Sequence, residues 1–169
     1  DLSGYLSEEF KKEEIEIILV GGACVTIYSE NRYQSHDLDF VTYEDFQKVR
    51  KVLKNLGFVE SSGYFSHKDC QWIVEFVSPP IAVGEEPIQE FSEIETGLGT
   101  VKLLKVSDSV KDRLASFYHW NDRQGLEQAI SICLESTCVD FSEIESWSEK
   151  EGFKKEFQHF LRTFESKKG

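Results

Sequence analysis

The stretch IEIILVGGACVTIYSENRYQSHDLDF, residues 15–40, decides the fold. Its first part, Ile15–Val20, is almost uniformly apolar and predicts a buried strand. Gly21-Gly22 follows directly and predicts a sharp turn from this strand into a helix. Asp37-Leu38-Asp39-Phe40 begins fifteen residues after the glycine pair, and its alternation with apolar residues predicts a second strand that extends to Val41.

The spacing of Asp37 and Asp39 predicts a cation site. Side chains of a strand alternate between its two faces, so two carboxylates two residues apart point to the same face. Like charges side by side repel, and a cation between them relieves the repulsion. Mg²⁺ held by carboxylates and a substrate phosphate suits this pair. Glycines at the turn would let the backbone approach such a phosphate, and the N-terminus of the following helix offers unpaired N–H donors.

Periodicity and turn signals predict the other elements of the first half. Thr42 with Asp45 resembles a capping box, and Gly57 suits the position just after a helix end. An acidic loop is expected from Pro79-Pro80 to about Gly99. The remaining elements expected here are helices over Leu2–Glu14, Ala23–Ser29 and Thr42–Leu56, and short strands over Phe58–Glu60, Tyr64–Ser66, Gln71–Val77 and Val101–Val106.

Only helices are expected in the second half. Asp108 is predicted to cap a helix through about Trp120, and Asn121 to cap the next, Asp122–Ser136. Two further helices are expected over Phe141–Lys150 and Gly152–Lys167, the last with a stripe of phenylalanines that predicts a core-facing side. The chain is therefore expected to be α/β (α+β), with a mixed sheet flanked by helices over residues 1–106 and a C-terminal helical extension over 107–169.

Composition limits the class of partner. The net charge of −12 and the scattered basic residues disfavour a protein that grips long DNA or RNA by its phosphates. Contact with one end of a nucleic acid, such as a tRNA terminus, is compatible with this charge. No apolar run approaches the roughly 20 residues that cross a bilayer, so no membrane partner is expected. The four cysteines lack paired metal spacing, which favours free thiols and a cytoplasmic location.

The order of these motifs resembles the nucleotidyltransferase superfamily related to DNA polymerase β. Gly21-Gly22 and Asp37-Leu38-Asp39 match its first two motifs, and Val74-Glu75-Phe76 is the candidate for its third. Leu19–Phe40 is similar to minimal bacterial nucleotidyltransferases related to abortive-infection toxins. Ser107–Gln124 resembles the helical segment that follows the catalytic sheet in that group, so the resemblance covers roughly residues 15–135.

The resemblance implies an enzyme that moves a nucleotidyl group from an NTP to a hydroxyl. Asp37, Asp39 and Glu75 would then be the catalytic carboxylates and the ligands of two Mg²⁺ ions. Glu75 departs from the family pattern, in which the third acid is more often Asp. Residues expected to contact the nucleotide are Gly21, Gly22, Arg32, Ser35 and Lys111, with Arg113 as the competing choice to Lys111.

The acceptor and two alternative functions stay open at this point. Members of the superfamily modify tRNA, partner proteins or small molecules, and some work as toxin or antitoxin with a cognate partner. The acidic composition favours a protein or a small, positively charged acceptor. In one alternative the chain binds nucleotide or a partner without catalysis, because Glu75 does not serve as the third acid. In the other, the helix carrying Phe153–Phe164 is an interaction surface.

Overall fold

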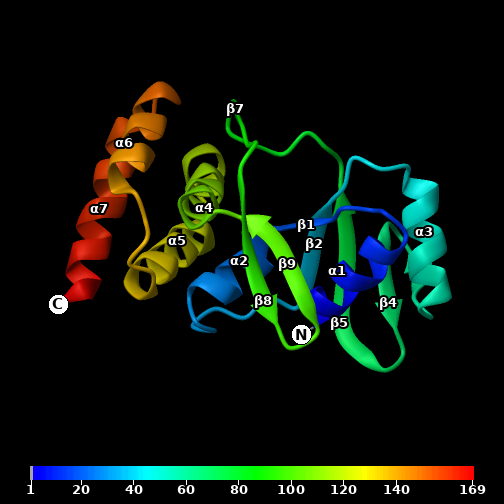
Figure 1. Ribbon diagram of the computed structural model, residues 1–169. Helices are drawn as coiled ribbons and strands as arrows, with labels where there is room; N and C mark the ends of the chain where they lie inside the picture. Colours follow the sequence, from blue (N-terminus) through cyan, green and yellow to red (C-terminus); the bar gives the residue numbers. More distant parts are fainter. Residues whose placement is uncertain (1) are drawn as a thin grey trace. The chain divides into compact units, whose positions relative to one another are not determined.

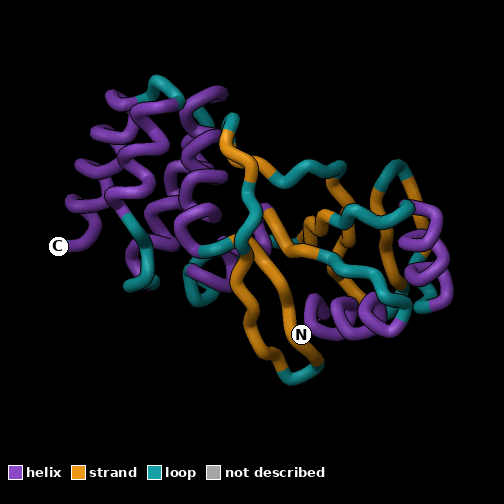
Figure 2. The backbone as a smooth tube through the Cα atoms, turned by 45° about the horizontal axis from the view of Figure 1, so that its top comes forward, coloured by secondary structure: helices purple, strands orange, loops and turns teal. Residues whose placement is uncertain are grey.

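The computed structural model describes residues 2–169, which form two compact units. The first unit comprises the chain through Ala23, Ser35–Pro80 and Glu90–Leu104. The second comprises Cys24–Gln34, Ile81–Gln89 and Lys105–Gly169. Figure 1 labels most helices and strands of both units. Figure 2 distinguishes the strands of the first unit from the helices that make up most of the second.

A seven-stranded mixed sheet forms the first unit. The strand order is β3-β4-β5-β2-β1-β9-β8. Strand β2 pairs antiparallel with β1 and parallel with β5, which places β2 near the middle of the sheet. The strands are β1 (Ile18–Val20), β2 (Asp37–Val41), β3 (Val59–Ser61), β4 (Tyr64–His67), β5 (Cys70–Val77), β8 (Phe91–Thr96) and β9 (Gly99–Leu104).

Aromatic side chains pack two helices on one face of this sheet. The helices are α1 (Leu2–Lys12) and α3 (Phe46–Asn55). The ring of Phe76 on β5 lies 5.7 Å from Phe10 of α1, 5.8 Å from Phe40 of β2 and 6.1 Å from Phe46 of α3, measured between centroids. Such ring clusters bury much apolar area and dominate core energetics. This face is the core of the unit, so alternate residues of β2 and β5 point to the opposite face.

Four helices form most of the second unit. Helix α4 (Val106–Trp120) contacts α5 (Arg123–Glu135) and α6 (Phe141–Lys150), and α7 (Lys154–Lys168) contacts α5 and α6. The hairpin of β6 (Ala82–Val83) and β7 (Glu86–Pro87) belongs to this unit, as does most of helix α2 (Gly21–Tyr28). The predicted phenylalanine stripe of α7 is confirmed as core, because Phe157, Phe160 and Phe164 are all buried.

Two predicted boundaries in the first half are wrong. Helix α2 begins at Gly21, directly after β1, and not at Ala23 as expected. The sharp turn that was predicted here is made by Gly21, whose φ is +65°. Thr42 does not cap a helix. Its hydroxyl donates to the Glu16 carbonyl at 2.7 Å, and α3 begins after Asp45, whose carboxylate accepts from the Gln47 N–H at 2.9 Å. Thr42 thus binds the segment just before β1 and does not cap α3.

Three further predictions need correction. The expected loop before Gly99 contains the β6–β7 hairpin and strand β8. Helix α4 begins at Val106, which was expected to end a strand, and Asp108 lies inside the first turn instead of capping it. Asn121 ends α4 in the left-handed conformation, and Asp122 caps α5 by accepting from the Gln124 N–H at 2.9 Å.

Two observations concern the cysteines and membranes. All four cysteines are free, and burial raises the pKa of the Cys133 thiol to about 12. None of the helices formed by residues 2–169 combines the length and the apolar content that crossing a bilayer requires.

Candidate active site

Three carboxylates share one face of the sheet in the first unit. Asp37 and Asp39 alternate with Leu38 and Phe40, which are buried on the helix-covered side. Asp39 pairs in register with Glu75 of the parallel strand β5. Residues paired in this way point to the same side, and neighbouring strands lie about 4.8 Å apart. Asp37 and Glu75 are exposed and Asp39 is half-buried, so this acidic row is open to a ligand.

The acidic row adjoins the N-terminus of α2. Val20, the last residue of β1, pairs in register with Asp39, so the next residue, Gly21, lies beside the Asp39 side chain. A Cβ at Gly21 would lie 2.5 Å from Oδ2 of Asp39, which is closer than atoms can approach. Gly21 also has φ +65°, a conformation that favours glycine. Geometry and space therefore both require glycine here.

Ser35 fixes the backbone where the acidic row begins. Its buried hydroxyl donates to the Asp37 carbonyl at 2.9 Å and accepts from the Asp37 N–H at 3.2 Å. The structure therefore places Ser35 where it can orient the first carboxylate. Contact of Ser35 or Gly22 with a nucleotide stays a prediction.

The donor set at this row fits Mg²⁺ when a phosphate completes it. Mg²⁺ is usually bound through one or two carboxylates together with substrate phosphates and water, rather than by an all-protein cage. Asp37 and Asp39 supply such a pair of hard oxygen ligands on one face. Among residues 2–169, no group of three or more His, Cys, Asp and Glu side chains is placed to hold a metal ion without further ligands.

The face continues beyond Glu75 to a tyrosine that the sequence did not single out. Tyr64 of β4 pairs in register with Glu75, so its half-buried ring stands on the same side. Across the strands, this face therefore presents in order the turn at Gly21, Asp39, Glu75 and Tyr64. Alternation from Tyr64 and Glu75 gives the other residues of this face of β3, β4 and β5, none of them basic: Val59, Ser61, Ser66, Gln71, Ile73 and Val77.

The predicted arginine contacts lie in the second unit and are paired there. Arg32 forms an ion pair with Glu135 of α5. Arg113 on α4 donates from Nε to Asp112 at 3.0 Å and from Nη1 to Gln128 at 3.3 Å. Both arginines thus already bind protein acceptors, and their predicted contact with phosphate is untested.

Lys111 is a buried cation among three carboxylates of the second unit. Its side chain is 0% exposed, and its Nζ lies 2.6 Å from Glu143, 3.1 Å from Glu86 and 3.3 Å from Asp108. Burial by itself lowers the pKa of Lys111, but the hydrogen bonds to Glu143 and Glu86 outweigh it and hold that pKa above its ordinary value. Burial raises the pKa of Asp108, against the lowering effect of Lys111. The ammonium group therefore joins α4, the β6–β7 hairpin and α6, and its predicted phosphate contact stays a prediction.

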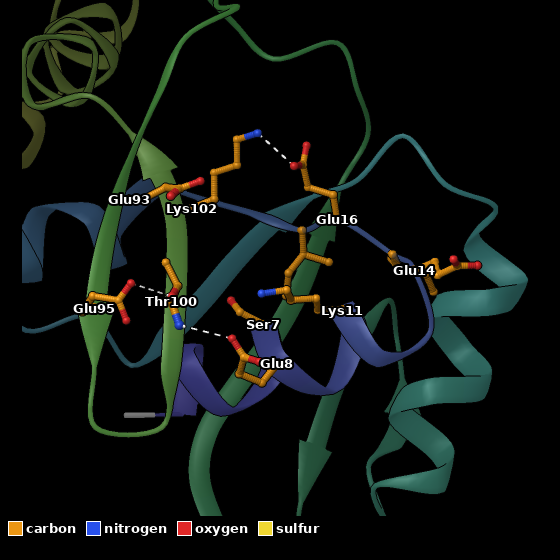
Figure 3. A pocket seen from close by; sticks show the side chains of 11 residues that line it. Ser7, Glu8, Lys11, Glu14, Glu16, Glu93, Glu95, Thr100 and Lys102 are labelled. Carbon is orange, nitrogen blue, oxygen red and sulfur yellow. Dashed lines mark hydrogen bonds and ion pairs between the residues drawn. The ribbon is translucent and has the colours of Figure 1, made fainter.

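A cavity of about 390 Å³ in the first unit lies away from these side chains. It is lined by α1, the segment before β1 and the β8–β9 hairpin (Figure 3). Some of its polar groups pair with one another: Lys102 Nζ lies 2.9 Å from Glu16, and Thr100 Oγ1 donates to Glu95 at 2.7 Å. None of Asp37, Asp39 and Glu75 lines it, so it is separate from the acidic row.

Comparison with solved structures identifies the fold. No protein-family model and no curated protein sequence matches the chain. An antigenic nucleotidyltransferase-like protein from Paracoccidioides brasiliensis superposes with a TM-score of 0.56 at 16% identity, over 75% of this chain and 71% of that one. The antibiotic-resistance factor ANT(2'')-Ia superposes with a TM-score of 0.53 at 13% identity, over 94% of this chain and 90% of that one. The fold is nucleotidyltransferase-like. The predicted fold class is thereby confirmed, and the narrower resemblance to abortive-infection toxins stays a prediction.

Proposed function

We propose that the chain is a Mg²⁺-dependent nucleotidyltransferase that moves an NMP from an NTP to an acceptor hydroxyl. The observation that carries the proposal is the packing of Asp39 against Gly21, with a would-be Cβ 2.5 Å from Oδ2. This packing brings the glycine turn, which suits phosphate binding, next to Asp39, which suits metal binding. The N-terminus of α2 lies beside Asp39, and a helix N-terminus is a favourable place for a phosphate to bind.

The residues of the row take distinct roles in the proposed reaction. Asp37 and Asp39 would hold Mg²⁺, which would supply positive charge to stabilise the negative charge on the phosphates. Glu75 takes the proton from the acceptor hydroxyl. The hydroxyl oxygen bonds to the α-phosphorus, the bond from that phosphorus to the oxygen bridging to the β-phosphate breaks, and pyrophosphate leaves.

Strand order supports one arrangement of the two substrates in the proposed site. Gly21 and α2 follow β1 on one side of Asp39, so the triphosphate binds there. The acceptor then approaches from the opposite side, over β5 and β4, where Glu75 and Tyr64 stand. Because no basic side chain lies on that face of β3, β4 and β5, the approach favours an acceptor that is not phosphate-rich. A protein or small-molecule hydroxyl fits better than a tRNA end.

The substitution Glu75→Gln tests the assigned proton acceptor. We expect transfer of α-labelled nucleotide to fall by about 10²–10⁴-fold, because an amide cannot take the proton. Binding of Mg²⁺ and NTP should persist, since Asp37 and Asp39 are unchanged. The measurements are label transfer with a cell extract as acceptor source, and calorimetric NTP binding. Full transfer by Glu75→Gln would show that Glu75 is not the third acid.

Nucleotide binding without transfer is the second candidate function. It is favoured by Glu75, an exposed glutamate at the position where the family pattern more often has aspartate. In that case the wild-type chain binds Mg²⁺ and NTP, yet releases no pyrophosphate with any acceptor source. Glu75→Gln and wild type then behave alike in every assay, which separates this function from the proposed one.

A further inference from the structure

The second unit contains an open cavity of about 650 Å³ that takes no part in the proposed transfer reaction. One wall is a face of α4, on which Asp112, Ser116 and His119 recur at helical spacing. The turn between β6 and β7 forms the second wall, and the C-terminal end of α6 forms the third. All three elements belong to the same unit.

Hydrogen bonds hold the turn and the end of α6 in place. The Glu85 N–H donates to Oε1 of Glu151 at 2.9 Å. The turn passes so close to that carboxylate that a Cβ at Gly84 would lie 2.5 Å from Oε2. The indole N–H of buried Trp147 donates to the Val83 carbonyl at 3.3 Å. The cavity walls are thus fixed before any ligand arrives, which lowers the entropy cost of binding.

An exposed tryptophan borders this cavity. Trp120, at the end of α4, is 77% exposed, whereas Trp147 is 2% exposed. The His119 ring lies beside Trp120, with centroids 5.6 Å apart, and packs edge-on against Phe153. The face of an indole is the strongest aromatic partner for an organic cation. Trp120 therefore offers an exposed aromatic face at the cavity, where such a cation can stack.

The cavity lining carries more carboxylates than ammonium groups. Glu85, Asp112 and Glu151 line the cavity, together with Lys150 and the imidazole of His119. The last carbonyl groups of α6 add partial negative charge at the same end. Arg113 pairs with Asp112 but is not among the lining residues. The carboxylates stand on more than one wall, so a ligand with several separated positive groups meets more of them than a single ion does.

We propose that this cavity binds a linear organic polyamine, with an ammonium group against Trp120 and others near Glu85 and Glu151. The proposal does not depend on nucleotidyl transfer, because its residues are distinct from the acidic row. A phosphate-bearing ligand is disfavoured by the same charges. Spermidine is the probe, since it carries three ammonium groups on a flexible chain.

Titration of the full chain with spermidine tests this proposal by calorimetry and tryptophan fluorescence. We expect saturable binding at one site, weakened about tenfold or more by Trp120→Ala and by Glu85→Gln, and less by Trp120→Phe, which keeps an aromatic face. Both side chains are exposed, so these variants should melt at the wild-type temperature. Glu145→Gln is the matched control, because Glu145 is an exposed carboxylate of α6 outside the cavity.

Three results would overturn the proposal. Equal weakening by Glu145→Gln and Glu85→Gln would show diffuse attraction to an acidic chain. Equal binding of an uncharged diol of the same length would show an apolar groove without cation selectivity. Absence of saturable spermidine binding by a folded wild-type chain would show that the cavity takes no polyamine.

Discussion

Replacing Asp39 by asparagine is expected to lower nucleotidyl transfer by about a thousandfold or more, equivalent to about 4 kcal/mol of transition-state stabilisation. Asparagine has nearly the same shape but is neutral, so its amide oxygen is a much weaker ligand for Mg²⁺ than the carboxylate. Asp39 is half-buried on β2, between Gly21 and Glu75. The rate of label transfer at saturating NTP measures the effect.

Two variants sharpen this test. Asp69→Asn removes an exposed carboxylate from the turn between β4 and β5 and should leave the rate unchanged. Gly21→Ala keeps every acid but adds a Cβ that would lie 2.5 Å from Oδ2 of Asp39, so it should also reduce transfer by displacing that carboxylate. Wild-type transfer by a well-folded Asp39→Asn chain would contradict the assigned role.

Replacing Lys111 by methionine is expected to destabilise the chain by about 3 kcal/mol. Methionine preserves most of the packing, but it leaves three carboxylates without their shared cation. Removing one partner of a buried pair costs about 3–5 kcal/mol. The lower figure applies because the side chains of Glu86 and Glu143, 39% and 47% exposed, can be solvated by water while Asp108 stays buried. Denaturant unfolding at neutral pH measures the loss.

The pH dependence of this ion cluster has a definite sign. The folded-state pKa of Lys111 is raised, so the stabilisation it provides is fully present below its unfolded pKa. That stabilisation is lost only as the pH rises through the folded-state pKa. Lys102→Met is the control, because Lys102 pairs with Glu16 at the surface and should cost at most about 1 kcal/mol. If Lys111→Met instead unfolds like wild type but binds NTP poorly, Lys111 contacts the nucleotide.

The acidic row could be predicted because its information is local. Alternation around Leu38 and Phe40 gives β2 with its observed bounds, Asp37–Val41. The same period places both aspartates on one face, and Val74 and Phe76 mark the core side of β5 around Glu75. The resemblance to nucleotidyltransferases depends on the same residues, and the fold agrees with it.

Elements that depend on distant partners could not be predicted. Strand β8 contains Glu93 and Glu95, and glutamate is depleted in strands. The strand forms because it pairs along its length with β9. In the sequence, Lys111 is a single cation near the start of a predicted helix. Its partners Glu86 and Glu143 are 25 and 32 residues away, so local patterns do not indicate them. Tyr64 meets Glu75 only because β4 and β5 shift register between Phe65 and His67, which no short pattern indicates.

The measurement that tests the central claim most directly is calorimetric titration of each NTP, with and without Mg²⁺, on the wild-type chain and on Asp37→Asn/Asp39→Asn. Both substitutions keep the strand residues that pack the core, so the double variant should melt as wild type does. The account predicts Mg²⁺-dependent binding of at least one NTP to the wild type and its loss in the double variant. Absence of binding by a folded wild-type chain, or equal binding by both chains, would contradict it.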